Sequence, residues 1–280
     1  MLLLSIVKVG TGTSTQYHAI NSQWAQDSIY DYQWNFITNV GTGGLGLITS
    51  VILVNDYFWV TRWVGDFWRF STTWSNQIMA TGIPSGSNYQ WVAYYPTTNQ
   101  FYVTNIGSGY NRVDVFTYGL AYLSNIAVSG GVGQGISFYN DLMYIPNTSG
   151  QINIIDPSNS NTVNTVTISE CSGTLGQITF DSIGNYAVAC YSNSKVVLYS
   201  STNVYLNTLI TDSQPQVAIV DDVGRFVVAT YGAVDIFETL SNSSVTMPTT
   251  TVKLATSNIQ GKSLIKNHDF QLMIFEYLIF

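Results

Sequence analysis

Charged side chains are scarce in this chain. Only 9% of its 280 residues are Asp, Glu, Lys or Arg, and the nine Lys and Arg residues form no cluster. A nucleic-acid-binding surface needs a basic patch that neutralises successive phosphates, whereas the net charge here is −7. The composition therefore argues against a nucleic-acid partner.

Long apolar runs are lacking as well. No segment approaches the roughly 18 apolar residues that a transmembrane helix needs. Residues 270–280, FQLMIFEYLIF, are too few and include Glu276, so we interpret them as part of a buried strand pair. The N-terminal MLLLSIVKVG has no basic segment and no cleavage site of small residues, so we interpret it as a strand and not as a signal peptide. We predict no membrane-spanning segment.

Cysteine and histidine number two each. Cys171 and Cys190 lack the spacing of a zinc site, and the sequence leaves open whether they are buried thiols or a disulfide. His268 lies in a predicted turn beside Asp269, and His18 alternates within a predicted strand as a core or edge group. Neither histidine belongs to a motif with a nucleophile, a carboxylate pair or a metal ligand. We therefore expect no cofactor and no enzymatic activity.

The chain is rich in Tyr, Gly, Asn, Ser and Thr, which favour strands and polar turns over helices. A run of apolar residues, a turn and a second apolar run recur at intervals of roughly 39 to 46 residues. These pairs lie at 2–20, 47–64, 89–106, 135–147, 176–191, 215–231 and 263–275. Third strands are predicted at 67–71, 113–117, 152–156, 196–200 and 234–238, and fourth strands include 161–168 and 204–210.

Four antiparallel strands in each 40-odd residues are typical of a β-propeller blade. The sequence predicts one all-β propeller domain over 1–280. Seven blades of four antiparallel strands are favoured, with the last completed by an outer strand near residues 1–9. The alternative is six blades over about 1–256 followed by a hairpin at 257–280.

One repeat carries a family resemblance. Residues 102–105 read YVTN and are followed by VDVFT, and the next repeat contains INIIDPSNSNTVNTVTI. Over about 89–240 the chain resembles the YVTN family of propeller repeats, in a degenerate form. Such propellers occur in archaeal and bacterial surface-layer proteins, so the resemblance implies a surface-exposed setting. Relatives of the family also include lactonase-like proteins and metal-dependent hydrolases.

Six of the sixteen acidic residues fall where turn geometry explains them. Asp side chains bond to their own backbone in turns, which accounts for those in the first hairpin of each repeat. These are Asp56, Asp141, Asp181, Asp221, Asp222 and Asp269. The remaining acidic residues are scattered, and Asp66, Asp114, Asp156 and Asp235 do not share one repeat position. No metal site is therefore predicted.

Glycine-rich segments and sequons are also explained without a ligand. GTGGLG at 41–46 matches a pyrophosphate-binding pattern, but that pattern needs a following helix and a strand follows here. It is interpreted, like SGGVGQG at 129–135, as a loop between blades. The glycosylation sequons at Asn147 and Asn242 are expected by chance in a chain this rich in Asn, Ser and Thr.

Aromatic residues gather at 57–74, where packing between blades competes with a surface patch for a partner. The loops between second and third strands converge on one face of a propeller and offer a second surface. Together these features predict a set of binding residues: Trp59, Trp63, Asp66, Trp68, Tyr110, Asn111, Asn193 and Tyr231.

The favoured function is a non-enzymatic structural or binding module that presents loops to a protein or glycan partner. A virion or extracellular surface fits the family resemblance, and a virion component would need no signal peptide. Assembly into a larger particle or surface layer follows from that setting. The alternatives are a metal-dependent hydrolase or lactonase-like enzyme, and an intracellular scaffold in the cytoplasm.

Overall fold

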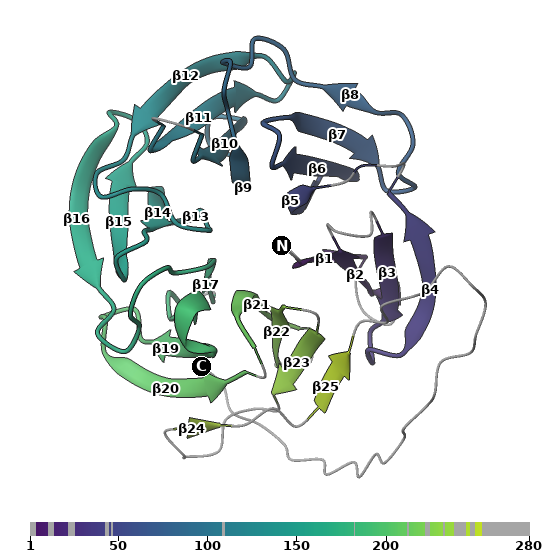
Figure 1. The fold of residues 1–280 in the computed structure, drawn as a ribbon, viewed down its shortest axis with the longest axis vertical. Helices are drawn as coiled ribbons and strands as arrows, with labels where there is room; N and C mark the ends of the chain where they lie inside the picture. Colours follow the sequence, from purple (N-terminus) through teal and green to yellow (C-terminus); the bar gives the residue numbers. More distant parts are fainter. Residues whose placement is uncertain are drawn as a thin grey trace.

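A computed structural model describes most of the chain up to residue 253. The described residues are 4–10, 14–21, 26–42, 45, 47–107, 110–181, 183–211, 213–221, 225–231, 233–237, 245–246 and 250–253. Their strands form six small sheets arranged around a ring, which is a β-propeller (Figure 1). The predicted all-β propeller is confirmed, and the sheets are called blades 1 to 6 in chain order.

The first three blades each have four antiparallel strands, which run in chain order from the centre of the ring to its rim. Blade 1 contains β1 (Leu4–Val9), β2 (Gln16–Asn21), β3 (Gln26–Asp31) and β4 (Phe36–Gly41). Blade 2 contains β5 (Ile48–Val54), β6 (Tyr57–Arg62), β7 (Phe67–Ser71) and β8 (Ile78–Met79). Blade 3 contains β9 (Tyr89–Tyr95), β10 (Gln100–Asn105), β11 (Arg112–Thr117) and β12 (Tyr122–Ala127).

The other three blades follow the same order. Blade 4 contains β13 (Ser137–Tyr139), β14 (Leu142–Pro146), β15 (Gln151–Asp156) and β16 (Asn161–Thr167). Blade 5 contains β17 (Ile178–Phe180), β18 (Tyr186–Cys190), β19 (Lys195–Tyr199) and β20 (Tyr205–Ile210). Blade 6 contains β21 (Pro215–Val220), β22 (Phe226–Thr230), β23 (Ala233–Phe237) and β25 (Thr250–Lys253).

The blade count is six in the described residues, so the alternative prediction holds and the favoured count of seven does not. Six of the seven predicted pairs form the two inner strands of blades, whereas the pair at 263–275 lies outside the described residues. The strand near residues 1–9 is the innermost strand of blade 1 and not the outer strand of a seventh blade, because it pairs with β2. The predicted hairpin at 257–280 also lies outside the described residues.

Blade 5 has a fifth strand. The chain leaves β23 of blade 6, and β24 (Val245–Thr246) pairs in parallel with the outer strand β20, outside it on the rim (Figure 1). The chain then returns to blade 6 as β25, which pairs with β23. An outer edge of this propeller therefore accepts an added strand.

The ring closes through side-chain packing between blades 6 and 1. Strand β1 contacts β21 and β22. The indole Nε1 of Trp34 in blade 1 donates to a carboxylate oxygen of Asp221 in blade 6 at 3.4 Å, and the Trp34 ring stacks on Tyr17 at 4.3 Å. Asp221 is thus more than the local turn residue that the sequence predicts.

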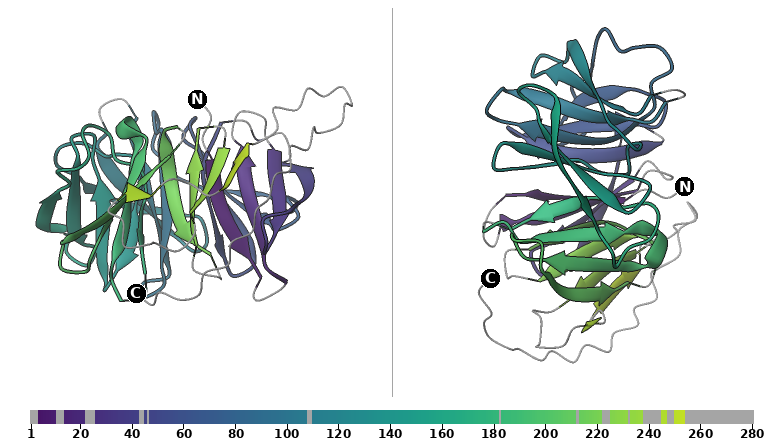
Figure 2. Two further views of the ribbon diagram at one scale, coloured as in Figure 1. Left: turned by 90° about the horizontal axis from the view of Figure 1, so that it is seen from below. Right: turned by 90° about the vertical axis from the view of Figure 1, so that its left-hand side faces the viewer.

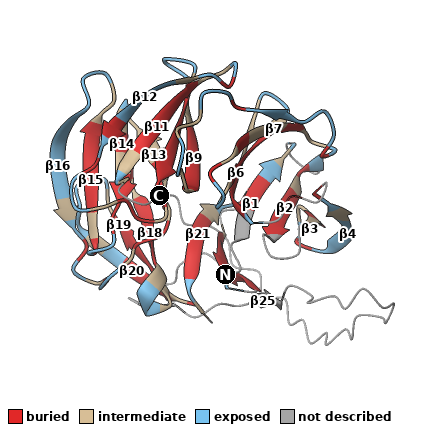
Figure 3. Ribbon diagram, turned by 45° about the horizontal axis from the view of Figure 1, so that its top comes forward, coloured by how far each residue is buried: buried red, intermediate tan, exposed pale blue. Residues whose placement is uncertain are grey.

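The core lies between the blades, because the inner strands are buried on both faces while the outer strands are largely exposed (Figure 3). The aromatic run at 57–74 supplies much of it. Trp59 is fully buried and stacks on Phe101 of blade 3 with ring centroids 3.9 Å apart, and Phe67 packs beside both rings. Trp68 packs, partly buried, against the blade 1 side of the same sheet. The packing interpretation therefore accounts for both tryptophans.

A buried polar group joins blades 1 and 2. His18 and Asp27 are 3% and 0% exposed, and His18 Nδ1 lies 2.6 Å from Asp27 Oδ2. The same carboxylate oxygen accepts from Nε1 of Trp74 in blade 2 at 2.9 Å. His18 is therefore a bonded core residue, as the sequence suggests. His268 lies outside the described residues.

Polar residues also fix the turns. Asp31, Ser71, Thr117, Asp156 and Ser200, at the end of the third strands, each accept a backbone N–H of the following turn with a side-chain oxygen. In the first hairpins, Asp56 and Asp141 have positive φ, and Asp181 accepts the N–H groups of Ile183 and Asn185. The predicted turn role holds for these three, whereas Asp222 and Asp269 lie outside the described residues.

Seen edge-on, the strands run across the thickness of the ring (Figure 2). Because successive strands alternate in direction, the loops after each second strand and the connections after each fourth strand share one face. SGGVGQG at 129–135 lies in such a connection, as predicted. Of GTGGLG at 41–46, Gly41 ends β4 and residues 43, 44 and 46 lie outside the described residues. Helical structure in the described residues includes the 3-10 turn Tyr191–Asn193. Those residues contain no helix that is long and apolar enough to span a membrane.

Replacement of two tryptophans only four residues apart distinguishes core from surface. We expect Trp59→Ala to lower the free energy of unfolding by about 3–5 kcal/mol, because it empties a closed site between blades. Trp63→Ala, at a side chain 38% exposed, should change it by at most about 0.5 kcal/mol. Urea denaturation measures both, and equal losses would contradict the assignment of Trp59 to the core.

Buried tyrosines predict an alkaline limit to stability. Burial raises the pKa of Tyr30 and of Tyr186 to about 12 from an ordinary value of 10.0. The unfolded chain then loses the two phenolic protons at lower pH than the folded chain. The contribution of these tyrosines to the free energy of unfolding is therefore complete below pH 10.0 and is lost as the pH rises through about 12. The urea midpoint should fall over this range, and it should fall less steeply in a Tyr30→Phe, Tyr186→Phe double variant. Identical slopes would refute the prediction.

Candidate functional site

We call the face that carries the second-to-third-strand loops and the blade-to-blade connections the connection face. It includes the loops at 63–66, 106–107, 110–111, 147–150 and 191–194, and the connections at 80–88, 129–136 and 168–177. In blades 2, 3 and 6 the residue after the second strand donates its backbone N–H to the connection that enters its blade. Trp63 donates to Leu47 O at 2.9 Å, Ile106 to Asn88 O at 2.9 Å, and Tyr231 to Gln214 O at 3.1 Å. These bonds hold each loop against a connection.

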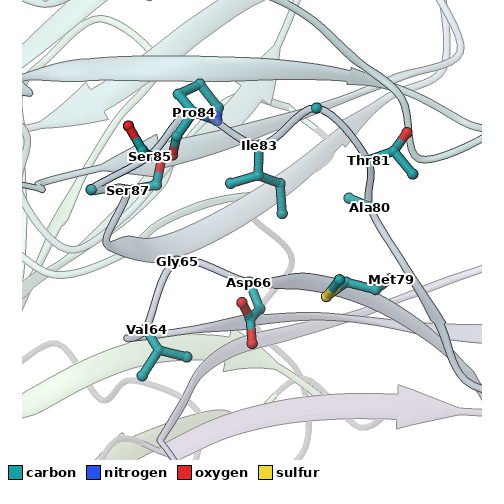
Figure 4. Close-up of a pocket in the computed structure, with 12 residues that line it drawn as sticks. Val64, Gly65, Asp66, Met79, Ala80, Thr81, Ile83, Pro84, Ser85 and Ser87 are labelled. Carbon is teal, nitrogen blue, oxygen red and sulfur yellow. Dashed lines mark hydrogen bonds between the residues drawn. The ribbon is translucent and has the colours of Figure 1, made fainter.

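A pocket opens on the connection face between blades 2 and 3 (Figure 4). Its volume is about 570 Å³. One wall comes from the loop after β6, at 64–66, and the other from β8 and the connection at 79–87. The lining is mainly apolar or uncharged, with Val64, Met79, Ile83 and Pro84 beside hydroxyl groups.

The two walls approach closely at a glycine. Gly65 has φ +85°, and a Cβ at this position would overlap the carbonyl oxygen of Ser87. Only glycine therefore allows the loop after β6 to lie against the connection. The walls of the pocket are fixed by this contact.

An exposed apolar patch adjoins the pocket. Leu47, Trp63 and Val64 are 50%, 38% and 51% exposed, and the backbone bond from Trp63 to Leu47 keeps them together. With its oxygen toward the indole, the Asn88 amide accepts from Trp63 Nε1 at 3.3 Å and donates to Trp63 O at 3.0 Å. The Trp63 ring is thus held in place while much of it faces solvent. We call these three residues the blade 2 patch.

Charge at the pocket is confined to one carboxylate. Asp66 is the only ionisable residue in the lining, and its Oδ2 lies 3.0 Å from Nη1 of Arg62. The two side chains are 28% and 21% exposed. The pair leaves the pocket nearly neutral, which suits an uncharged ligand surface.

The next loop along the face is tied to the same wall. The Tyr110 hydroxyl donates to Ser85 O at 3.1 Å, and the Tyr110 ring lies 3.8 Å from Cζ of Arg112. Arg112 pairs in turn with the fully buried Asp114, Nε to Oδ1 at 2.7 Å. Tyr110 and the exposed Asn111 therefore belong to the surroundings of the pocket.

Asp114 organises the interior beneath this loop. Its Oδ2 accepts from the Tyr89 hydroxyl at 3.0 Å and from Asn105 Nδ2 at 2.8 Å. Burial, followed by the charge of Asp114, raises the pKa of Tyr89 above the ordinary range. Asn105, the last residue of the YVTN segment, also accepts from Asn88 N at 3.0 Å. It thereby joins β10 to the connection that forms the pocket.

The prediction that Asp66, Asp114, Asp156 and Asp235 do not share one repeat position is confirmed for the four together, but two of them do coincide. Asp114 and Asp235 both occupy the third position of their third strands, β11 and β23, and Asn153 occupies it in β15. All three side chains are buried. The shared position is therefore an internal bonding position, and its carboxylates do not face the pocket.

A disulfide joins Cys171 and Cys190, which resolves the open choice in favour of the bonded form. Cys190 is the last residue of β18, as Asn105 is of β10, and Cys171 lies in the connection that enters blade 5. The disulfide thus makes covalently the link that Asn105 makes by hydrogen bonds in blade 3.

The predicted binding residues separate into groups. Asp66 lines the pocket, Trp63 directly precedes the lining residue Val64, and Tyr110 is bonded to the pocket wall at Ser85 with Asn111 next to it in the chain. Asn193 and Tyr231 lie on the same face but in blades 5 and 6. Asn193 is engaged in accepting Ser172 N at 2.7 Å, whereas Tyr231 is 48% exposed.

Sequence reasoning missed Leu47, Val64 and the wall at 79–87. The sequence did contain a signal for this wall. No alternating run follows β7, because β8 has only two residues, and the Gly- and Pro-containing segment TGIPSGS comes next. The sequon at Asn147 is buried, and its Oδ1 accepts two backbone N–H groups. Asn242 lies outside the described residues.

Comparisons with known proteins give no name to this site. No protein-family model matches the chain. No curated protein matches it either. Within the described part of the chain, no group of three or more His, Cys, Asp or Glu residues is placed to hold a metal ion.

Loss of the disulfide should weaken the connection face. We expect Cys171→Ser with Cys190→Ser to lower the free energy of unfolding by about 3 kcal/mol, since the bond closes a loop with a sequence separation of 19 residues. Thermal unfolding with and without reductant measures the effect. A wild-type chain whose midpoint is unchanged by reductant would contradict a bonded pair.

Proposed function

We propose that the chain is a non-enzymatic binding module whose blade 2 patch and adjoining pocket dock a protein partner. The main observation is that the three apolar residues of the blade 2 patch are neighbours in the structure, are each at least 38% exposed, and lie beside a cavity of about 570 Å³. Exposed apolar surface next to a pocket costs solvation free energy in the isolated protein, and that cost is recovered when a partner covers it. The partner gains a site for an apolar anchor residue.

A protein fits this surface better than a glycan does. Sugars stack on aromatic rings and need polar groups around them, but Leu47, Val64 and Met79 offer aliphatic surface. The one carboxylate in the pocket lining is already paired with Arg62. Trp63 alone would suit either partner, and its neighbours favour the protein.

Three observations support the non-enzymatic part of the proposal. The His18 and Asp27 pair is closed between blades 1 and 2, where no substrate reaches it. Asp114 is likewise fully buried and is bonded to Arg112, Tyr89 and Asn105. The pocket itself brings only Asp66 to the surface as an ionisable group.

We also propose a virion or extracellular surface as the setting. The disulfide supports it, because such bonds persist in oxidising surroundings and are rare in the reducing cytosol. The resemblance to YVTN repeats remains a prediction that agrees with this setting.

Site-specific photocrosslinking tests the proposal. With a photoreactive phenylalanine analogue at Val64, we expect one discrete crosslinked protein adduct in extracts of the cells in which the protein occurs. We expect Trp63→Asp to reduce the yield of this adduct at least about tenfold. The reason is that the anchor surface is lost while the fold is kept.

The matched control carries the same analogue at Ile183, which is 54% exposed in a hairpin turn on the opposite face. An equal yield of crosslinked protein at Val64 and Ile183, or a yield that Trp63→Asp does not lower, would contradict the proposed docking surface. Binding on a glycan array that disappears with Trp63→Ala would assign the site to a sugar and overturn the protein partner.

A further inference from the structure

The outer edge of blade 1 is open along its length. Strand β4 is six residues long and largely exposed, and among the described strands it pairs only with β3 (Figure 3). Phe36 and Ile37 are adjacent in this strand and therefore point to opposite faces of the sheet, and each is 46% exposed. The strand contains no Lys or Pro, the residues that commonly protect an edge from pairing.

The other outer edges differ from that of β4. The edge of β20 is covered by β24, and the start of β12 is bridged by Thr81, which accepts Tyr122 N at 3.0 Å. The edge of β16 is exposed, but its sequence NTVNTVT is mostly polar. Strand β8 also carries two adjacent exposed apolar residues, Ile78 and Met79, but it is only two residues long. Among the outer strands compared here, β4 is thus the one that combines a length of six residues with exposed apolar side chains on both faces.

The protein already shows that a late segment of its chain can extend a blade. Strand β24 adds to the rim of blade 5, and the chain then returns to blade 6 and reaches Lys253 at the end of β25. Blade 6 contacts blade 1, the next blade around the ring. Residues 254–269 number 16 and can span roughly 55 Å when extended, so the C-terminal segment at 270–280 can reach β4.

This C-terminal segment has the composition that such an edge needs. Nine of the eleven residues in FQLMIFEYLIF, at 270–280, are apolar. Alternate residues of an extended strand point to opposite faces, and here both alternating sets are predominantly apolar. An added strand of this kind would cover Phe36 on one face and Ile37 on the other.

We propose that residues 270–280 bind, within the same chain, as an additional strand on the open edge of β4. The pairing satisfies the outward backbone groups of β4 and removes both apolar surfaces from water. It makes blade 1 a five-stranded sheet like blade 5. This inference is independent of the proposed docking at the blade 2 patch.

Amide hydrogen exchange read by mass spectrometry tests the pairing. The full chain is compared with a chain that ends at Asp269. We expect peptides covering β4 to exchange at least about tenfold faster in the shorter chain, because their outward amides lose their partners. Peptides covering β16, whose edge receives no strand, should exchange equally in both.

A second pair of variants keeps the test decisive if the shorter chain does not fold. Ile274→Pro in the full chain should speed amide exchange in β4 as the truncation does, because proline disrupts the added strand. The matched Ser257→Pro, between β25 and the segment, should leave the exchange of β4 unchanged. Equal exchange of β4 in all four chains would overturn the proposal. The proposal would also be overturned if the C-terminal segment slowed the exchange of β16 and not that of β4. Protection of β4 that disappears when the full chain is diluted would mean that the added strand comes from another copy, and this too would overturn it.

Discussion

The structure depends on how each incoming connection is fastened to the blade that it enters. The backbone N–H after a second strand donates to that connection in blades 2, 3 and 6. Asn105 reinforces the fastening in blade 3, and the Cys171 to Cys190 disulfide does so in blade 5. Without this fastening a blade has no fixed angle to its neighbour, and the interdigitated rings of Trp59, Phe67 and Phe101 could not pack. The pocket lies between one such connection, at 80–88, and the loop after β6.

Much of the fold could be predicted because each blade corresponds to one repeat of apolar runs and turns in the sequence. The recurring pairs of apolar runs indicated the inner hairpin of each of the six blades, and alternating runs indicated the third strands of blades 2 to 6. The third strand of blade 1, β3, was not predicted. The number of blades could not be read in the same way, since 263–275 has the same pattern as a blade and closure is a contact between residues far apart in the chain. Trp34 meeting Asp221 leaves no local signal.

The candidate site was predictable only in part, and for a related reason. Trp59 and Trp63 have the same parity in the sequence, but β6 ends at Arg62, so one ring is in the core and the other is on the surface. Leu47 and Val64 are single apolar residues in loops, where no periodicity marks them. The shared position of Asp114 and Asp235 emerged only once strand boundaries were known. The choice between thiols and a disulfide likewise needed the distance between two loops.

The closure of the ring has an evolutionary consequence. In the described residues blades 1 to 5 each take their four main strands from consecutive strands of the chain, blade 6 does so with β24 of blade 5 intervening, and no strand is exchanged between blades 6 and 1. The boundary between these blades is therefore built like every other boundary. A duplication or deletion of one of the repeats of blades 1 to 4 would therefore add or remove a complete four-stranded sheet and leave no half-finished one.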